Sequence, residues 1–175
     1  TTVSRGNYTG NTLDAIIVAA DQMTGIHNWS KLDVPYHIPS GLQLIPGGTL
    51  TIMPGVVMHF GQDSRLYVNE GASGSKPSLI AVGTVEEPIV FTSIDKTLSA
   101  WRGIYFDSPS TLNEIGFARI ENASNTNQAG AIENWYGTVL NVHDVQFKNI
   151  QNCAILYYLS SGATSGLTTN NLSFE

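Results

Sequence analysis

Short apolar segments separated by proline or glycine run through most of the chain. Within residues 34–61 the apolar pieces YHI, LQLI, LTI and VVMHF are three to five residues long, and Pro or Gly stands between them. Pieces of this length are too short for ordinary helices, so the pattern predicts a series of β-strands. The stretch LTIMPGVVMHF, residues 50–60, suits either a hairpin that folds back at Pro54-Gly55 or two strands of a coil that turns a corner there.

Internal repetition favours the coil. A first column of strand ends recurs at similar intervals along the chain, with the members Met58/Phe60, Ile89/Phe91, Ile120/Asn122, Val145/Phe147 and Leu172/Phe174. A second column recurs at similar intervals, each member after a small residue: Ile104, Ile132 and Ile155. Insertions at 71–77 and 97–101 account for the longer intervals of the first column. Two columns that advance in step predict one coil per repeat.

The predicted fold class is therefore all-β, a single-stranded parallel β-helix (solenoid) of about five coils. A β-sandwich is the alternative, because short strands at regular spacing also suit it. Residues 1–28 are expected to form an entry segment with a capping strand or short helix, and the pattern at 13–20 favours a strand. Residues 29–175 are expected to form the β-helix domain, as part of a longer protein.

Glycine and asparagine mark the expected corners. Glycines with unusual backbone angles are predicted at Gly41, Gly47-Gly48, Gly55 and Gly83. The asparagines near the repeating turns can bond to a neighbouring coil or to a stacked amide: Asn122, Asn141, Asn149 and Asn171.

The segments PYHI, GGTLTIMPGVVMHFG, LIAVGTVEEPIVFTS and WRGIYF resemble the repeats of secreted bacterial surface proteins with a right-handed parallel β-helix of the pectate-lyase-like fold. One departure is Met53, where that group often has an acidic residue before Pro-Gly. The resemblance implies right-handed coils and a secreted or cell-surface setting, with a signal that is not present in this chain. It implies no activity, because such coils occur in enzymes, adhesins and other surface proteins.

The composition of the chain limits the kinds of partner that the protein is expected to bind. The formal net charge is −6 and the basic residues are scattered, which argues against nucleic acid. No apolar run is long enough for a membrane-spanning helix, so no transmembrane segment is predicted. The single cysteine, Cys153, has no partner for an internal disulfide and is expected to be a small buried residue.

The sequence shows no convincing catalytic or metal-binding cluster. The acidic residues are mostly single, and the adjacent pair Glu86-Glu87 is expected to solvate a turn. His143 and Asp144 are neighbours on a strand, so they should point to opposite faces and form no dyad, unless a bend between the flanking valines brings both to a corner. The first column places Asp144 beside Arg119, where a surface ion pair is expected. No zinc spacing links the histidines, so neither a metal nor a cofactor is predicted.

A patch on the outer face of the second column is the candidate ligand site. Alternation along the strands directs five aromatic or acidic side chains outward on successive coils: Tyr105, Asp107, Glu133, Trp135 and Tyr158. Such a surface could stack against a sugar ring while the carboxylates accept hydrogen bonds from the hydroxyl groups of the sugar. The alternative is that these rings are covered by a loop at 122–128 or only decorate a strand that favours aromatics.

The predicted function is a non-catalytic exported surface module, a rigid adhesin-like scaffold or a glycan-binding β-helix. Its expected partner is a polysaccharide or a cell-surface glycan. The alternative is a polysaccharide lyase or glycoside hydrolase with Arg119 or His143 in a groove outside the coils. A third interpretation is end-to-end self-association through open coils.

Overall fold

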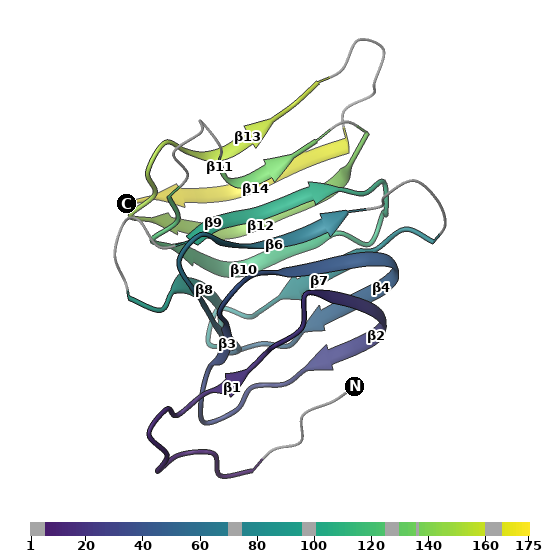
Figure 1. Ribbon diagram of the computed structural model, residues 1–175. Helices are drawn as coiled ribbons and strands as arrows, with labels where there is room; N and C mark the ends of the chain where they lie inside the picture. Colours follow the sequence, from purple (N-terminus) through teal and green to yellow (C-terminus); the bar gives the residue numbers. More distant parts are fainter. Residues whose placement is uncertain (1–5, 70–74, 96–100, 125–129, 136, 160–165) are drawn as a thin grey trace.

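The computed structural model describes residues 6–69, 75–95, 101–124, 130–135, 137–159 and 166–175. These residues form strands and connecting turns, without a helix (Figure 1). The strands in chain order are β1 (Ile16–Ile17), β2 (Gln22–Trp29), β3 (Tyr36–Ile38), β4 (Leu42–Ile52), β5 (Val57–Phe60), β6 (Ser64–Asn69), β7 (Ser78–Val82), β8 (Ile89–Ser93), β9 (Trp101–Asp107), β10 (Glu114–Glu121), β11 (Gly130–Asn134), β12 (Val139–Lys148), β13 (Cys153–Tyr157) and β14 (Gly166–Phe174).

The strands stack in three faces, and every recorded strand pair is parallel. Face 1 holds β1, β3, β5, β8 and the last residues of β10, β12 and β14. Face 2 holds the later residues of β2 and β4, then β7 and the first residues of β10, β12 and β14. Face 3 holds the first residues of β2 and β4, then β6, β9, β11 and β13. This is the all-β parallel β-helix expected from the repeats.

The stretch 50–60 turns a corner of the coil and is no hairpin. Strand β4 pairs with β2, β6 and β7, whereas β5 pairs with β3 and β8, so the two strands lie on different faces. Gly55 has a φ of 74°, a left-handed conformation that costs glycine little. The strand interpretation of 13–20 also holds, because β1 lies there and pairs with β3.

The core fills the inside of the coils with large apolar side chains. Inward residues alternate with outward ones, as in β6, whose Leu66 and Val68 are fully buried. Two interior rings, Phe60 and Trp101, stack with centroids 4.3 Å apart. Burial of each such side chain stabilises the fold by about 1.5–3 kcal/mol. Each coil packs against the next, so the inward side chains of neighbouring coils form one core.

The two predicted columns differ in how well they agree with the observed strand register. The second column is confirmed, because Ile104, Ile132 and Ile155 are in register. The first column is wrong at three of its four steps by two residues: Met58 faces Phe91 rather than Ile89, for example. Sequence spacing could not detect the slip, because a shift of two residues keeps the same side chains on the inward face.

The corner between faces 2 and 1 carries a column of left-handed residues. Phe117, Asp144 and Asn171 have φ values of 45°, 52° and 48° and follow one another on successive coils. At a second corner Asn149 Nδ2 donates to Asn122 Oδ1 at 3.0 Å. The predicted stacking of amides at the turns is thus confirmed for that pair.

Candidate functional site

Four aromatic side chains from four successive coils line one strip of face 3, here called the aromatic column: Tyr67, Tyr105, Trp135 and Tyr158. Tyr67 and Tyr105 are directly in register. Trp135 and Tyr158 lie just after β11 and β13, where their backbone N–H groups donate to Phe106 and to Asn134 and continue the ladder. All four side chains are partly exposed.

The rings of the aromatic column overlap one another. The centroids of Tyr67 and Tyr105 are 5.6 Å apart, those of Tyr105 and Trp135 also 5.6 Å, and those of Trp135 and Tyr158 4.0 Å. Rings this close cannot lie side by side flat on the sheet, so each covers part of its neighbour. The column therefore offers ring edges, hydroxyl groups and partial ring faces to a ligand.

A buried ion pair lies beside the column. Arg65 Nη2 is 2.6 Å from Glu133 Oε1, and only 11% and 5% of the two side chains are exposed. The guanidinium is also 5.6 Å and 5.8 Å from the ring centroids of Tyr67 and Tyr105. Trp135 Nε1 donates to Glu133 Oε2 at 3.1 Å. The pair thus ties three coils together under the rings.

The intervening strand β9 carries a glycine next to Ile104. Gly103 has a φ of 86°, and a Cβ there would collide with the backbone oxygen of Ala131 on the next coil. The contact between Arg65 and Glu133 is direct but poorly aligned for a hydrogen bond, and Arg65 Nε has no hydrogen-bond partner among the described residues. Charge attraction therefore holds the pair more than hydrogen-bond geometry does.

Burial and nearby carboxylates keep the hydroxyl group of Tyr105, in the middle of the aromatic column, protonated. Burial raises the pKa of Tyr105 to about 12, and the charges of Asp107 and Glu133 act in the same direction. The phenol of Tyr105 consequently remains a neutral donor and acceptor over the whole physiological range.

The structure brings the five predicted site residues to one face, with a difference in their roles. Tyr105 and Glu133 are in register, and Asp107, Trp135 and Tyr158 follow them on the same face. Glu133, however, is buried and already bonded, so it is no open acceptor for a sugar. The covering loop considered at 122–128 lies in part outside the described residues, at 125–129.

Sequence reasoning missed Tyr67 and Arg65. The signal was present, since Leu66-Tyr67-Val68 repeats the order apolar, Tyr, apolar of Ile104-Tyr105-Phe106. The interval between these two segments is longer than any in the predicted columns, because the chain between them includes all of β7 and β8.

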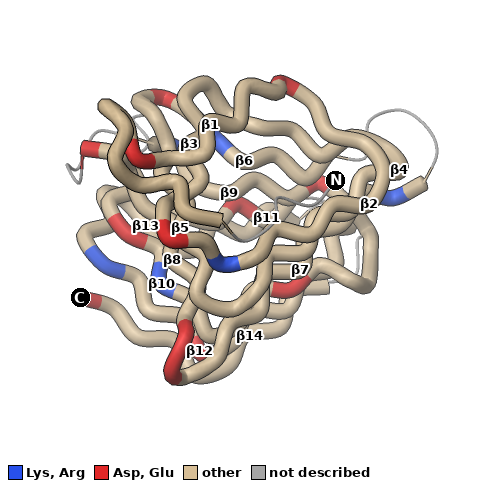
Figure 2. Tube along the Cα trace, turned by 90° about the horizontal axis from the view of Figure 1, so that it is seen from below, with Lys and Arg blue, Asp and Glu red and all other residues tan. Residues whose placement is uncertain are grey.

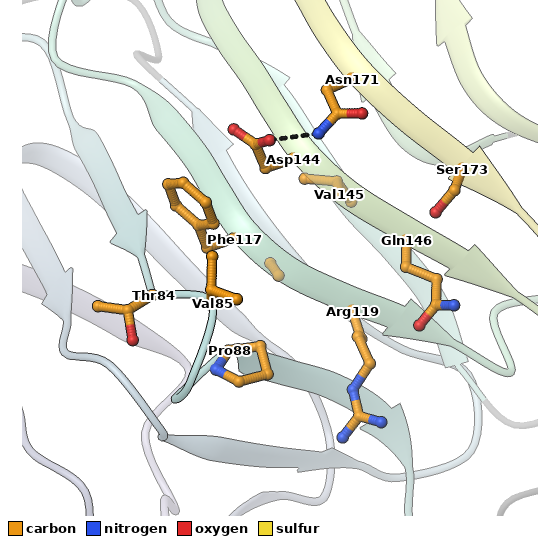
Figure 3. Close-up of a pocket in the computed structure, with 11 residues that line it drawn as sticks. Thr84, Val85, Pro88, Phe117, Arg119, Asp144, Val145, Gln146, Asn171 and Ser173 are labelled. Carbon is orange, nitrogen blue, oxygen red and sulfur yellow. Dashed lines mark hydrogen bonds between the residues drawn. The ribbon is translucent and has the colours of Figure 1, made fainter.

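A second candidate site is a shallow depression at the corner between faces 2 and 1 (Figure 3). Its volume is about 320 Å³, and it is lined by Thr84, Val85, Pro88, Phe117, Ala118, Arg119, Asp144, Val145, Gln146, Asn171 and Ser173. Thr84, Val85 and Pro88 come from the turn between β7 and β8, and the other lining residues come from β10, β12 and β14. An acidic and a basic side chain, Asp144 and Arg119, thus border the same depression.

The expectation that His143 and Asp144 point to opposite faces and form no dyad is wrong, and the alternative, a bend between the buried Val142 and Val145 that brings both to a corner, is confirmed. His143 Nδ1 is 2.8 Å from Asp144 Oδ2, because the left-handed backbone at Asp144 bends the strand and brings both side chains to the corner. His143 Nε2 also lies 3.2 Å from Glu114 Oε1. Hydrogen bonds from His143 and then from Asn171 lower the pKa of Asp144. The imidazole therefore links two carboxylates on adjacent coils.

The expected ion pair between Asp144 and Arg119 is also wrong. Arg119 is in register with Gln146, two residues further along β12, which is the same two-residue slip as in the first column. Its nearest acidic partner is Glu121, with Arg119 Nε 3.8 Å from Oε1. Asp144 is instead bonded to His143 and Asn171.

Other classes of site find little support in the described part of the chain. It contains no cluster of three His, Cys, Asp or Glu side chains arranged for a metal ion, and no helix that could span a membrane. Figure 2 shows the basic positions scattered over the coils. Cys153, expected to be buried, is half-buried, and this burial raises the pKa of its thiol.

No family model, curated protein or solved structure matches the chain. The fold assignment therefore rests on the parallel stacking of the strands, and any function has to be argued from the surface of the coils.

Proposed function

We propose that the protein is a non-catalytic exported surface module, a rigid β-helix that binds a glycan along the aromatic column. The observation that carries this proposal is the alignment of Tyr67, Tyr105, Trp135 and Tyr158 on four successive coils. Coils are about 4.8 Å apart, so the column presents a repeating surface to a repeating polymer. Aromatic surface with a few fixed polar groups is typical of ligand sites.

The rigidity of the site supports binding. The Arg65–Glu133 pair and the bond from Trp135 to Glu133 fix the side chains before any ligand arrives. A site that is already ordered loses less conformational entropy when a ligand binds. The hydroxyl groups of the tyrosines supply donors and acceptors at the ring edges.

Glycan-array screening followed by calorimetric titration tests the proposal. Trp135→Ala and Tyr158→Ala should each weaken binding about 5- to 150-fold, since loss of one stacked ring corresponds to roughly 1–3 kcal/mol. Phe117→Ala is the matched control, because it removes a half-exposed ring at the corner between faces 2 and 1, away from the aromatic column. Binding that both column variants leave unchanged would exclude the aromatic column, and no binding to any glycan would contradict the function.

The corner depression favours one alternative, a polysaccharide lyase or glycoside hydrolase. Its supporting observation is that Asp144 and Arg119 border one depression while His143 contacts Asp144. A panel of uronate and neutral polysaccharides, assayed with and without calcium, tests this alternative. Product formation that is lost in Asp144→Asn would favour the enzyme, and no product from any polymer would reject it.

A further inference from the structure

Face 3 carries a row of outward side chains that is longer than the aromatic column. The row begins with Gln22 of β2, which is in register with Gln43 of β4. Gln43 is in register with Tyr67, and Tyr67 with Tyr105. On β4, β6 and β9 the residue of the row stands between two buried apolar residues, so its side chain points away from the core. The row therefore continues the aromatic column by two coils toward the start of the chain.

The next position of the row explains why the aromatic column steps sideways. Glu133 is in register with Tyr105, but it is buried and paired with Arg65. At this coil the outward surface comes from Trp135, two residues further along, whose ring centroid lies 5.6 Å from that of Tyr105. The Tyr158 ring follows at 4.0 Å from the Trp135 ring.

Together these side chains form one continuous strip, here called the long strip: Gln22, Gln43, Tyr67, Tyr105, Trp135 and Tyr158. Each of its members lies on a different coil, so the long strip runs along the axis of the solenoid for about 24 Å at the usual spacing of about 4.8 Å. The aromatic column by itself spans about 14 Å at the same spacing. The two glutamines thus add a substantial length to the candidate site.

The two glutamines carry hydrogen-bonding groups that the described part of the protein leaves unused. Gln22 is exposed and Gln43 is half-buried, and neither side-chain amide bonds to another described residue. A carboxamide offers two N–H donors and an acceptor oxygen at the end of its side chain. The hydroxyl groups of a sugar both donate and accept, so these amides can bond to them in either sense.

The geometry of the long strip favours one shape of ligand. Its first four members are directly in register, so they form a straight line at a uniform spacing. In a β-1,4-linked glycan the chain is extended, and each sugar advances by a distance close to the spacing of the coils. An α-1,4-linked chain of the same sugars curves into a coil and leaves a straight line after a few units. The extended chain is therefore the one that can contact rings and amides together.

We infer that the glycan site extends along the long strip onto Gln43 and Gln22 and takes extended β-1,4-linked chains that lie along the axis of the solenoid. The aromatic column contacts one part of the chain, and the two amides hydrogen-bond hydroxyl groups of the sugars beyond it. This inference rests on the proposed glycan-binding function and adds to it a ligand class and two further binding residues.

Calorimetric titration of the wild-type protein with oligosaccharides of increasing length tests the inference. The probes are β-1,4-linked chains of glucose, mannose, xylose and N-acetylglucosamine, from the disaccharide to the hexasaccharide, and the α-1,4-linked hexasaccharide of glucose. The tightest-binding β-1,4-linked hexasaccharide should bind at least about tenfold more tightly than its trisaccharide, because only the longer chain reaches past the aromatic column. The α-1,4-linked hexasaccharide should bind at least about tenfold more weakly than that β-1,4-linked hexasaccharide.

Two variants assign the gain with length to the amides. Gln43→Ala and Gln22→Ala should each weaken binding of that hexasaccharide about 2- to 10-fold, the effect of losing one hydrogen bond, and leave binding of the trisaccharide unchanged. Gln62→Ala is the matched control, because Gln62 is an exposed glutamine in the turn between β5 and β6, outside the long strip. Circular dichroism checks that each variant is folded.

The outcomes separate this inference from the proposed function. Affinity that stops rising at the trisaccharide, or a gain with length that Gln43→Ala and Gln22→Ala do not reduce more than Gln62→Ala does, would overturn the extension and leave the aromatic column as the site. Binding of a glycan of the array but of no β-1,4-linked chain, or equal or tighter binding of the α-1,4-linked chain, would overturn the ligand class. Binding to no glycan at all would instead contradict the proposed function.

Discussion

Removing one charge of the Arg65–Glu133 pair should destabilise the fold far more than removing one charge of an exposed pair. The two pairs of the comparison have nearly the same separation, 2.6 Å for Arg65–Glu133 and 2.7 Å for Lys31–Glu87. They differ in burial, since 11% and 5% of the first two side chains are exposed, against 49% and 47% of the second two. The two pairs therefore differ in burial, and also in their cation and in the ring contacts of Arg65.

The expected magnitudes follow from desolvation. Among the described residues, Arg65→Met leaves the buried Glu133 carboxylate with only the indole N–H of Trp135, and breaking a buried pair costs about 3–5 kcal/mol. We expect a loss at the lower end of this range, because Trp135 still donates a hydrogen bond to the carboxylate. For a domain of this size that loss lowers the Tm by about 6–12 °C. Lys31→Met should cost about 0–1 kcal/mol, because water screens the exposed pair.

Urea denaturation followed by far-UV circular dichroism measures these losses for the wild type, Arg65→Met, Glu133→Gln, the double variant and Lys31→Met. The double variant should lose less than the sum of its two single variants by about 1.5 kcal/mol or more, since the second substitution removes the charge that the first left unpaired. Equal m-values are needed for the comparison. An Arg65→Met loss as small as that of Lys31→Met, or single losses that simply add, would refute the reasoning.

Three further predictions concern single positions. Ultraviolet titration of the tyrosines should show one group that ionises near pH 12 and that disappears in Tyr105→Phe. Because the pKa of Tyr105 in the folded protein lies above the ordinary value of 10.0, its contribution to stability is intact below pH 10 and is lost as the pH rises to about 12. A Tyr105 that titrates near pH 10 would contradict this prediction. Phe117→Asn should raise the free energy of unfolding by about 1 kcal/mol, because a bulky residue at a φ of 45° is strained and Asn tolerates that conformation; a clear loss in urea denaturation would show that the packing of the Phe117 ring outweighs the strain. Gly116→Ala should lower the free energy of unfolding by about 1–3 kcal/mol, since its Cβ would collide with the ring of His143. In the His143→Ala background this loss should largely vanish in urea denaturation. An equal loss in both backgrounds would show that the clash lies elsewhere.

The part of the fold that could be predicted is the part that local pattern encodes. Short apolar pieces with Pro or Gly between them forbid long helices, and two columns that advance in step require coils. The second column was also predicted in the correct register, because Ile104, Ile132 and Ile155 each follow a small residue that marks the position. From that register the five candidate residues of face 3 came together.

The corner between faces 2 and 1 could not be predicted in the same way. Strand alternation placed His143 and Asp144 on opposite faces, and the left-handed backbone of Asp144 reversed that result. A bend between the flanking valines was the alternative that the sequence left open, and aspartate favours a left-handed backbone without requiring it, so the residue type could not decide between the two. The two-residue slip then moved Arg119 away from Asp144 as well.

The sequence by itself determined that the chain forms coils and which side chains point inward, because the alternation of apolar and polar residues fixes the buried face of each strand. Only the tertiary structure decided which residue of one coil lies opposite which residue of the next coil. It alone paired Arg65 with Glu133, which lie on β6 and β11, two coils apart and distant in the sequence. The physical reason is that a slip of two residues leaves the core equally apolar, so the register depends on how side chains of neighbouring coils pack and pair in space.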